Sequence, residues 1–291
     1  MGAADIVPGV SGGTIAFITG IYERLIHALK SINTPALRQL LSGDVKEAWK
    51  TIDGNFLLAV FGGVLVSVFS LVKLISYLLE HEQVLLWSFF FGLILASALV
   101  IGQKVKKWTA GTVVALLAGI GIALYITLAT PAQTPDALWF VFLSGAIAIC
   151  AMILPGISGS FILLLLRKYE YIVGALKELD IITILVFMLG CVVGLLSFAR
   201  LLSWMFQRFH DLTIALLTGF MLGSLNMVWP WKAVLEYRTN SKGEEVPFRF
   251  ESVLPNHFEG DPQLLFAVSL AVGAFVLIYL LEKLANRSKK V

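Results

Sequence analysis

The sequence predicts an all-α integral membrane protein made of one domain, residues 1–291, with two inverted copies of one unit. Composition, a repeated Pro-Gly motif and the charge of the loops carry this prediction. Hydrophobic residues make up 58% of the chain, charged residues make up 14%, and the mean hydropathy is +0.87. Soluble domains are about 45–50% apolar and about 25% charged, so the chain is expected to lie in a membrane.

The apolar segments predict about six full transmembrane helices, because a spanning helix needs about 20 mostly apolar residues. These six segments are 56–79, 84–101, 111–130, 181–206, 212–228 and 264–281. Two further apolar regions, 3–29 and 137–176, are interrupted by proline and glycine. Irregular backbone survives in a bilayer only where protein or water surrounds it, so both regions are expected to be broken, re-entrant hairpins.

The motif Pro-Gly-x-Ser-Gly occurs in both interrupted regions, in residues 5–14 (the first tip) and 152–161 (the second tip). A shift of 147 aligns residues 4–30 with 151–177, and twelve of the 27 aligned positions are identical. A shift of 127 aligns residues 63–97 with 190–224, which pairs Lys73 with Arg200. The chain therefore divides into repeat one, about 1–130, and repeat two, about 131–291.

Loop charge predicts the orientation, because cytoplasmic loops carry an excess of Lys and Arg. The basic loops 30–50 and 102–108 and the basic C-terminus are placed in the cytoplasm, and loops 80–83, 131–136 and 229–263 outside. Counting crossings then puts 207–211 inside and 167–180 outside, so matching loops of the two repeats face opposite sides. The second tip becomes the end of a hairpin. The first tip should end a mirrored hairpin, but the arm that would precede this tip is almost absent, because residue 1 aligns with position 148.

The two tips are expected to form an anion site. Inverted repeats with broken helices are typical of secondary transporters, whose substrate lies where the breaks meet. Glycines let backbone N–H groups approach a ligand, and hydroxyls at a helix start suit phosphate or carboxylate. The residues in question are Gly9, Ser11, Gly12, Gly13 and Thr14, and Gly156, Ser158, Gly159 and Ser160. The alternative is that the glycines only permit tight turns and the serines only cap helices.

Charged residues near the tips supply further candidates. Lys73 and Arg200 occupy matching positions in apolar segments and would attract the anion, unless they snorkel to the interface. Arg24 and Arg167 are further candidates for binding the anion. Carboxylates that could carry a coupling proton are Asp5, Glu23 and Glu170, although the two glutamates could equally form interfacial ion pairs.

No cofactor or metal is expected. The four histidines lack metal-ligand spacing, and Cys150 and Cys191 lie in apolar segments as small buried side chains. No cleavable signal peptide is expected either, because no positive region precedes the first apolar run.

The run Ala4–Phe17, followed by Gly20–Leu25, resembles the signature of a bacterial membrane family linked to polyprenyl-phosphate transport. Leu154–Ser160 matches this signature too, and the resemblance covers essentially the full chain. It implies translocation of undecaprenyl phosphate, the lipid carrier of cell-wall synthesis, from the outer to the cytoplasmic leaflet of the bacterial plasma membrane. The implied partners are this lipid and the membrane. No nucleic acid is expected, and formation of a homo-oligomer is left open.

Two other functions use the same features. A membrane enzyme acting on a lipid phosphate would need a nucleophile held by a base, yet Ser11 and Ser158 have no histidine nearby in sequence. A channel or transporter for small ions would use the glycine breaks as a filter. The transporter is preferred, and the protein is not expected to be an enzyme.

Overall fold

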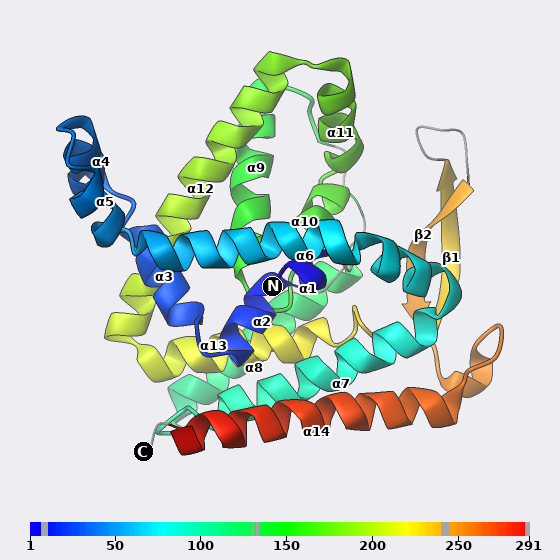
Figure 1. Ribbon diagram of the computed structural model, residues 1–291. Helices are drawn as coiled ribbons and strands as arrows, with labels where there is room; N and C mark the ends of the chain where they lie inside the picture. Colours follow the sequence, from blue (N-terminus) through cyan, green and yellow to red (C-terminus); the bar gives the residue numbers. More distant parts are fainter. Residues whose placement is uncertain (7–10, 130, 132–133, 240–244, 289–291) are drawn as a thin grey trace.

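The computed structural model describes residues 1–6, 11–129, 131, 134–239 and 245–288, which form a helical bundle with one small β-hairpin (Figure 1). The first half contains α1 (Gly2–Ile6), α2 (Gly12–Ile18), α3 (Tyr22–Lys30), α4 (Thr34–Leu41), α5 (Val45–Thr51), α6 (Gly54–His81), α7 (Gln83–Gly102) and α8 (Ala110–Leu128). The second contains α9 (Leu138–Ile153), α10 (Gly159–Leu165), α11 (Tyr169–Glu178), α12 (Ile181–Arg208), α13 (His210–Ser224), β1 (Lys232–Thr239), β2 (Glu245–Ser252), the 3-10 turn η1 (Pro255–His257) and α14 (Leu264–Ser288).

Four helices in the described part of the chain are long and apolar enough to cross a membrane, namely α6, α7, α8 and α12. The segment expected at 264–281 lies in α14. The apolar part of this helix, Leu264–Leu280, is shorter than the four helices that can span a membrane. The segment expected at 212–228 is α13, which ends at Ser224, four residues early, because the chain turns at Leu225–Val228. The molecule is therefore the helical membrane protein that its composition predicts.

Each of the two interrupted regions contains three short or medium helices, and residues 7–10 of the first motif lie outside the described residues. Region 3–29 contains α1, α2 and α3, and region 137–176 contains α9, α10 and α11. Adding 147 to both bounds of α2 gives the bounds of α10, and adding 127 to those of α6 gives those of α12. The helix ends therefore follow the same two shifts as the sequence.

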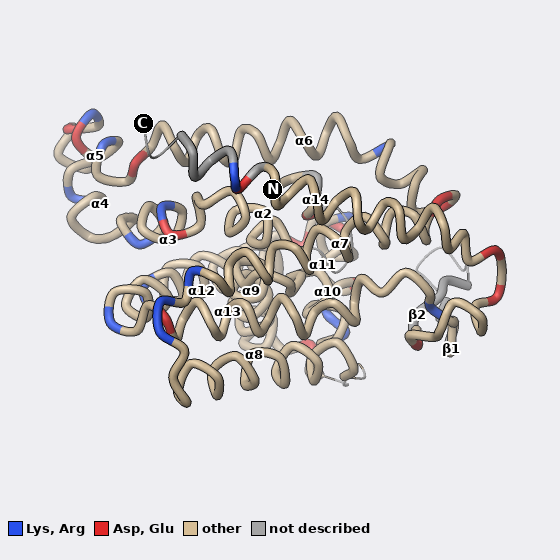
Figure 2. The backbone as a smooth tube through the Cα atoms, turned by 90° about the horizontal axis from the view of Figure 1, so that it is seen from below, with Lys and Arg blue, Asp and Glu red and all other residues tan. Residues whose placement is uncertain are grey.

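Glycines let the long helices pack backbone against backbone. In the pair α8 and α13, a Cβ on Gly219 would collide with the Leu116 carbonyl oxygen. In the pair α7 and α14, a Cβ on Gly92 would collide with the Ala271 carbonyl oxygen. Figure 1 shows α7 and α14 lying side by side, and Figure 2 shows α6 and α8 on opposite faces of the bundle.

The arm preceding each tip differs between the halves. In the second half α9 packs along α12, and a Cβ on Gly190 would collide with the Phe142 carbonyl oxygen. In the first half the five-residue α1 packs on α6, and Gly63, which corresponds to Gly190, has no described atom within 4 Å of its Cβ position. Much of α6 is consequently left exposed.

Two features of the connections were not expected from the sequence. The stretch 31–55 contains α4 and α5, which begin after the capping side chains of Asn33 and Asp44. Loop 229–263 contains the antiparallel pair β1 and β2, which extends from one end of the bundle (Figure 1). Figure 2 shows basic residues gathered at the end with α3, α4 and α5, while the connection from α6 to α7 carries acidic residues.

Candidate functional site

The two tips, which are about 140 residues apart in sequence, contact each other inside the bundle. The Ser11 hydroxyl donates to the Met152 carbonyl oxygen at 3.0 Å, and the Gly156 N–H donates to the Thr14 hydroxyl oxygen at 2.9 Å. Ser11 is 1% exposed and Thr14 is fully buried. The polar groups of one tip are therefore the hydrogen-bond partners of the other.

Two glycines allow the backbones of the two tips to approach this closely. A Cβ on Gly13 would collide with the Ile153 carbonyl oxygen of the other half. Gly156 has a φ of +90°, which L residues rarely adopt, and its Cβ position would collide with the Ser224 hydroxyl. Tyr22 adds a further bond between the halves, because its buried hydroxyl donates to the Ile153 carbonyl oxygen at 3.2 Å.

The first tip is closed by its own side chains. The Gly12 N–H donates to Oδ1 of Asp5 at 2.7 Å, and the Gly13 N–H donates to the Ser11 hydroxyl at 3.0 Å. The Asp5 oxygen accepts from a backbone N–H as a phosphate oxygen would, so it occupies the kind of place that a phosphate would take at this tip. Gly9, the remaining candidate here, lies outside the described residues.

The second tip is more open. The hydroxyls of Ser158 and Ser160 are 2.8 Å apart and share a hydrogen bond, and Ser160 is exposed while Ser158 is buried. Ser158 precedes α10 without a side-chain capping bond to it. Gly159 lies against α9, with its Cβ position 2.7 Å from the Ala148 carbonyl oxygen. The hydroxyl pair at this tip therefore reaches the surface, in contrast to Ser11.

The predicted cations do not converge on the tips. Lys73 and Arg200 are exposed, and no described residue forms a hydrogen bond or ion pair with either. Arg24 is engaged with the carboxylate of Asp53 at 2.7 and 3.0 Å, and this bond holds the pKa of Asp53 below its usual value. Arg167 is exposed and has a φ of +50°.

The two predicted glutamates are both exposed. Oε1 of Glu23 lies 3.5 Å from Nε2 of His210, which joins α3 to the start of α13.

Cys150 and Cys191 are half-buried free thiols, and each lies near a backbone carbonyl oxygen across the α9 and α12 contact. Among the described residues no group of His, Cys, Asp and Glu could hold a metal ion.

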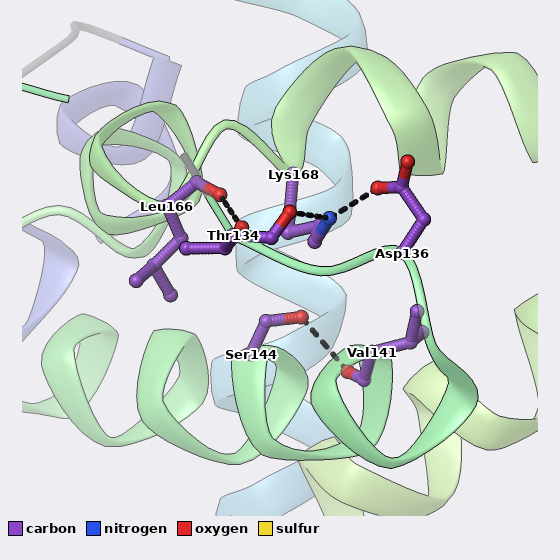
Figure 3. A network of polar contacts seen from close by, with 6 residues as sticks. All are labelled: Thr134, Asp136, Val141, Ser144, Leu166 and Lys168. Atoms are coloured by element: carbon purple, nitrogen blue, oxygen red, sulfur yellow. Dashed lines mark hydrogen bonds and ion pairs between the residues drawn. The ribbon is translucent and has the colours of Figure 1, made fainter. Parts of the chain in front are cut away.

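Lys168, which was not among the residues predicted from the sequence, is the most buried cation in the described part of the chain. Its side chain is 1% exposed, and its amine contacts the Asp136 carboxylate and the Thr134 carbonyl oxygen (Figure 3). The Thr134 hydroxyl donates in turn to the Leu166 carbonyl oxygen at 2.5 Å. This cluster ties the start of α9 to the joint between α10 and α11, at the base of the second hairpin. The one signal in the sequence was the pair of aromatic residues, Tyr169 and Tyr171, after this lysine.

Comparison with known proteins gives one consistent result. The chain matches the undecaprenyl phosphate translocase-like family over residues 1–246. It is 46% identical over 291 residues to a polyprenyl-phosphate transporter of Vibrio cholerae, which covers 99% of this chain and 94% of that protein. It is 31% identical over 248 residues to a polyprenyl-phosphate transporter of Staphylococcus aureus, covering 79% and 83% respectively. No solved structure matches the chain.

Proposed function

Because the chain belongs to the undecaprenyl phosphate translocase-like family, we propose that it is a transporter of polyprenyl phosphate in the bacterial plasma membrane. The lipid is undecaprenyl phosphate, carried from the outer to the cytoplasmic leaflet for reuse in cell-wall synthesis. Support comes from the two relatives named polyprenyl-phosphate transporters and from the apolar helices that can span a bilayer.

The observation that carries this proposal is the contact between the two tips. A phosphate headgroup crossing a bilayer needs hydrogen-bond donors that replace its water. The Ser11 hydroxyl, the Gly12 N–H and the Gly156 N–H are such donors, and all three are satisfied by protein groups here. The phosphate takes the place of these protein acceptors when the tips separate.

Each predicted site residue has a role in this cycle. The donors at the phosphate come from Gly9, Ser11, Gly12, Gly13 and Thr14, and from Gly156, Ser158, Gly159 and Ser160. Lys73, Arg200, Arg24 and Arg167 attract the anionic headgroup from the two membrane surfaces. Asp5, Glu23 and Glu170 are the groups that carry a coupling proton. No covalent bond of the lipid is made or broken, so the protein acts as a carrier and not as an enzyme.

The two halves act as an inverted repeat, with each tip ending a hairpin that enters from one side. The matching bounds of α2 and α10, and of α6 and α12, support this arrangement. Single cysteines at Asn33 and Leu254, after Cys150 and Cys191 are replaced by alanine, test the orientation. We expect a membrane-impermeant reagent to label position 33 from the cytoplasm and position 254 from outside. Labelling of both from one side would contradict the inverted repeat.

The function is tested with purified protein in liposomes that contain a labelled polyprenyl phosphate. We expect the label to exchange between leaflets faster than in protein-free liposomes, and a labelled polyprenol without phosphate to show no such acceleration. Release of inorganic phosphate would instead indicate an enzyme, and a steady current across a planar bilayer would indicate a channel. Absence of accelerated exchange with correctly folded protein would overturn the proposal.

A further inference from the structure

A partly buried lysine lies where β1 meets the bundle. The Lys232 amine donates to the Met227 carbonyl oxygen at 2.5 Å and lies 5.7 Å from the ring centre of Trp87 and 5.9 Å from that of Phe250. Among the side chains that the structure describes, which leave out those of Glu236 and Glu245, no carboxylate lies within ion-pair distance of it. The Met227 carbonyl oxygen accepts one of the three amine hydrogens, so the amine keeps donors for an anion.

Trp87, on the first turns of α7, presents a second unsatisfied donor. Its side chain is 7% exposed, and its indole N–H is buried without a hydrogen-bond partner among the described residues. Buried N–H groups are nearly always paired, and each unpaired one destabilises the fold. An indole N–H without an acceptor and an ammonium group with donors to spare thus lie near each other, on two different elements.

An apolar cavity of about 390 Å³ is lined by neighbours of these two residues. Phe91, one turn after Trp87 on α7, lines it together with Trp229 and Leu254. Ser252, the strand partner of Lys232, also lines it, and its hydroxyl is bonded to the Asn226 side chain at 2.9 Å. The cavity is within the usual size range of ligand pockets, roughly 300–1,000 Å³.

We propose that Lys232 and Trp87 bind the phosphate of a phosphate monoester whose apolar chain enters this cavity. The amine supplies charge, the indole supplies a directed donor, and the aromatic walls receive hydrocarbon. This end of the molecule carries loop 80–83 and the β-hairpin, both expected outside. The site is therefore where the lipid docks before it reaches the tips, an inference that rests on the proposed function.

The charge of Lys232 suits this role. Burial lowers the pKa of its amine to about 8, which still leaves most of it protonated at neutral pH. The competing interpretation is a purely structural lysine that holds the turn at Met227. That role needs only one donor and gives no part to the buried indole N–H.

The test measures binding of polyprenyl phosphate to the purified full chain. We expect Lys232→Met to weaken binding about tenfold or more, the loss typical of one hydrogen bond to a charged group. Lys232→Arg should retain most of the affinity, and Trp87→Phe should weaken it a few-fold. The exposed residues Lys104 and Trp108 provide controls, and Lys104→Met and Trp108→Phe should bind as the wild type does. Unchanged affinity in folded Lys232→Met would overturn the proposal.

A second measurement on the wild-type protein avoids any effect of substitution on folding. Acetylation of Lys232, followed by mass spectrometry, should be slowed by polyprenyl phosphate and not by polyprenol. Inorganic phosphate at the same concentration should protect weakly, because it leaves the cavity empty. Equal protection by inorganic phosphate would assign the site to the free anion and overturn the docking role. No protection by either would overturn the site itself, while leaflet exchange by the wild type would leave the proposed function standing.

Discussion

The first and second tips share a glycine framework but differ in how their polar groups are satisfied. At the first tip Asp5 and Ser11 accept hydrogen bonds from Gly12 and Gly13, so the backbone donors are already used. At the second tip Ser158 and Ser160 bond to each other, and Ser160 reaches the surface. The first tip is closed from within, and the second offers hydroxyls to a ligand.

The charged groups show the same division. The shift of 147 pairs Asp5 with Met152 and Lys168 with Ile21, so each half carries one sequestered charge that the other lacks. Asp5 bonds to the first tip itself, whereas Lys168 lies at the base of the second hairpin. The two copies of the repeat thus share the positions of their helices but carry different charged residues beside them. We infer that the first tip releases its donors on binding and that the second hairpin stays fixed.

The largest effect is expected where the tips touch. Gly13→Ala places a methyl group against the backbone carbonyl of Ile153, so the tips cannot close and leaflet exchange should be lost. Gly174→Ala is the matched control, because no described atom lies within 4 Å of its Cβ position. Exchange is measured in liposomes for both variants. Wild-type exchange by Gly13→Ala would show that tip contact is dispensable.

The next largest effect concerns the base of the second hairpin. Asp136→Asn leaves the buried Lys168 amine without its carboxylate, and we expect a loss of stability on the order of 3 kcal/mol. Lys168→Met should cost less, because the remaining Asp136 is 69% exposed and can be hydrated. Thermal unfolding in detergent measures both. The reverse order would mean that Lys168 is not held as a buried ion.

The two motif serines should separate stability from binding. Ser11→Ala removes one buried and one partly buried hydrogen bond, and we expect a loss of stability of about 1–3 kcal/mol. Ser158→Ala removes only its bond to Ser160, so stability should change little while lipid affinity falls about tenfold. Unfolding and binding are measured on each variant and on the double variant, whose binding losses should not add, because contacting residues couple. Additive losses would place the serines in separate sites.

A smaller, conditional effect is expected at Asp5. Asp5→Asn keeps an oxygen that can accept from the Gly12 N–H but removes the ionisable group. The fold should therefore survive, while any acceleration of exchange by an imposed pH gradient should disappear. Liposomes with and without a gradient measure this for wild type and variant. A variant that still responds to the gradient would move proton coupling to Glu23, Glu170 or elsewhere.

The smallest effects are expected for the exposed cations. Lys73→Met and Arg200→Met should leave stability unchanged within about 0.5 kcal/mol, since no described residue bonds to either side chain. If both attract the headgroup, exchange of polyprenyl phosphate should slow about two- to fivefold in each, the size of a weak exposed charge pair. Exchange at the wild-type rate in the double variant would indicate that Lys73 and Arg200 are interfacial anchors and do not attract the headgroup.

The long helices were predictable from the sequence, because a helix that spans a bilayer needs a long apolar segment. The interruptions were predictable because proline and glycine break such a helix, which a bilayer tolerates only where protein or water surrounds the break. The role of Lys168 was not, since its burial depends on Thr134 and Asp136, more than 30 residues away in sequence. The bond from Asp5 to Gly12 was missed for a similar reason, because it depends on how α1 packs against α2. The β-hairpin was missed although Val246, Phe248 and Phe250 alternate along β2, because the charge of this loop indicated only its side of the membrane.

The close packing of α8 with α13, and of α14 with α7, has a consequence for synthesis of the protein. In each pair one helix comes from repeat one and the other from repeat two. During translation α7 and α8 therefore enter the bilayer well before their partners exist, and lipid must cover their glycine faces until α13 and α14 arrive. Neither repeat is a self-sufficient folding unit, and a chain cut near residue 131 should assemble only when both fragments are made together.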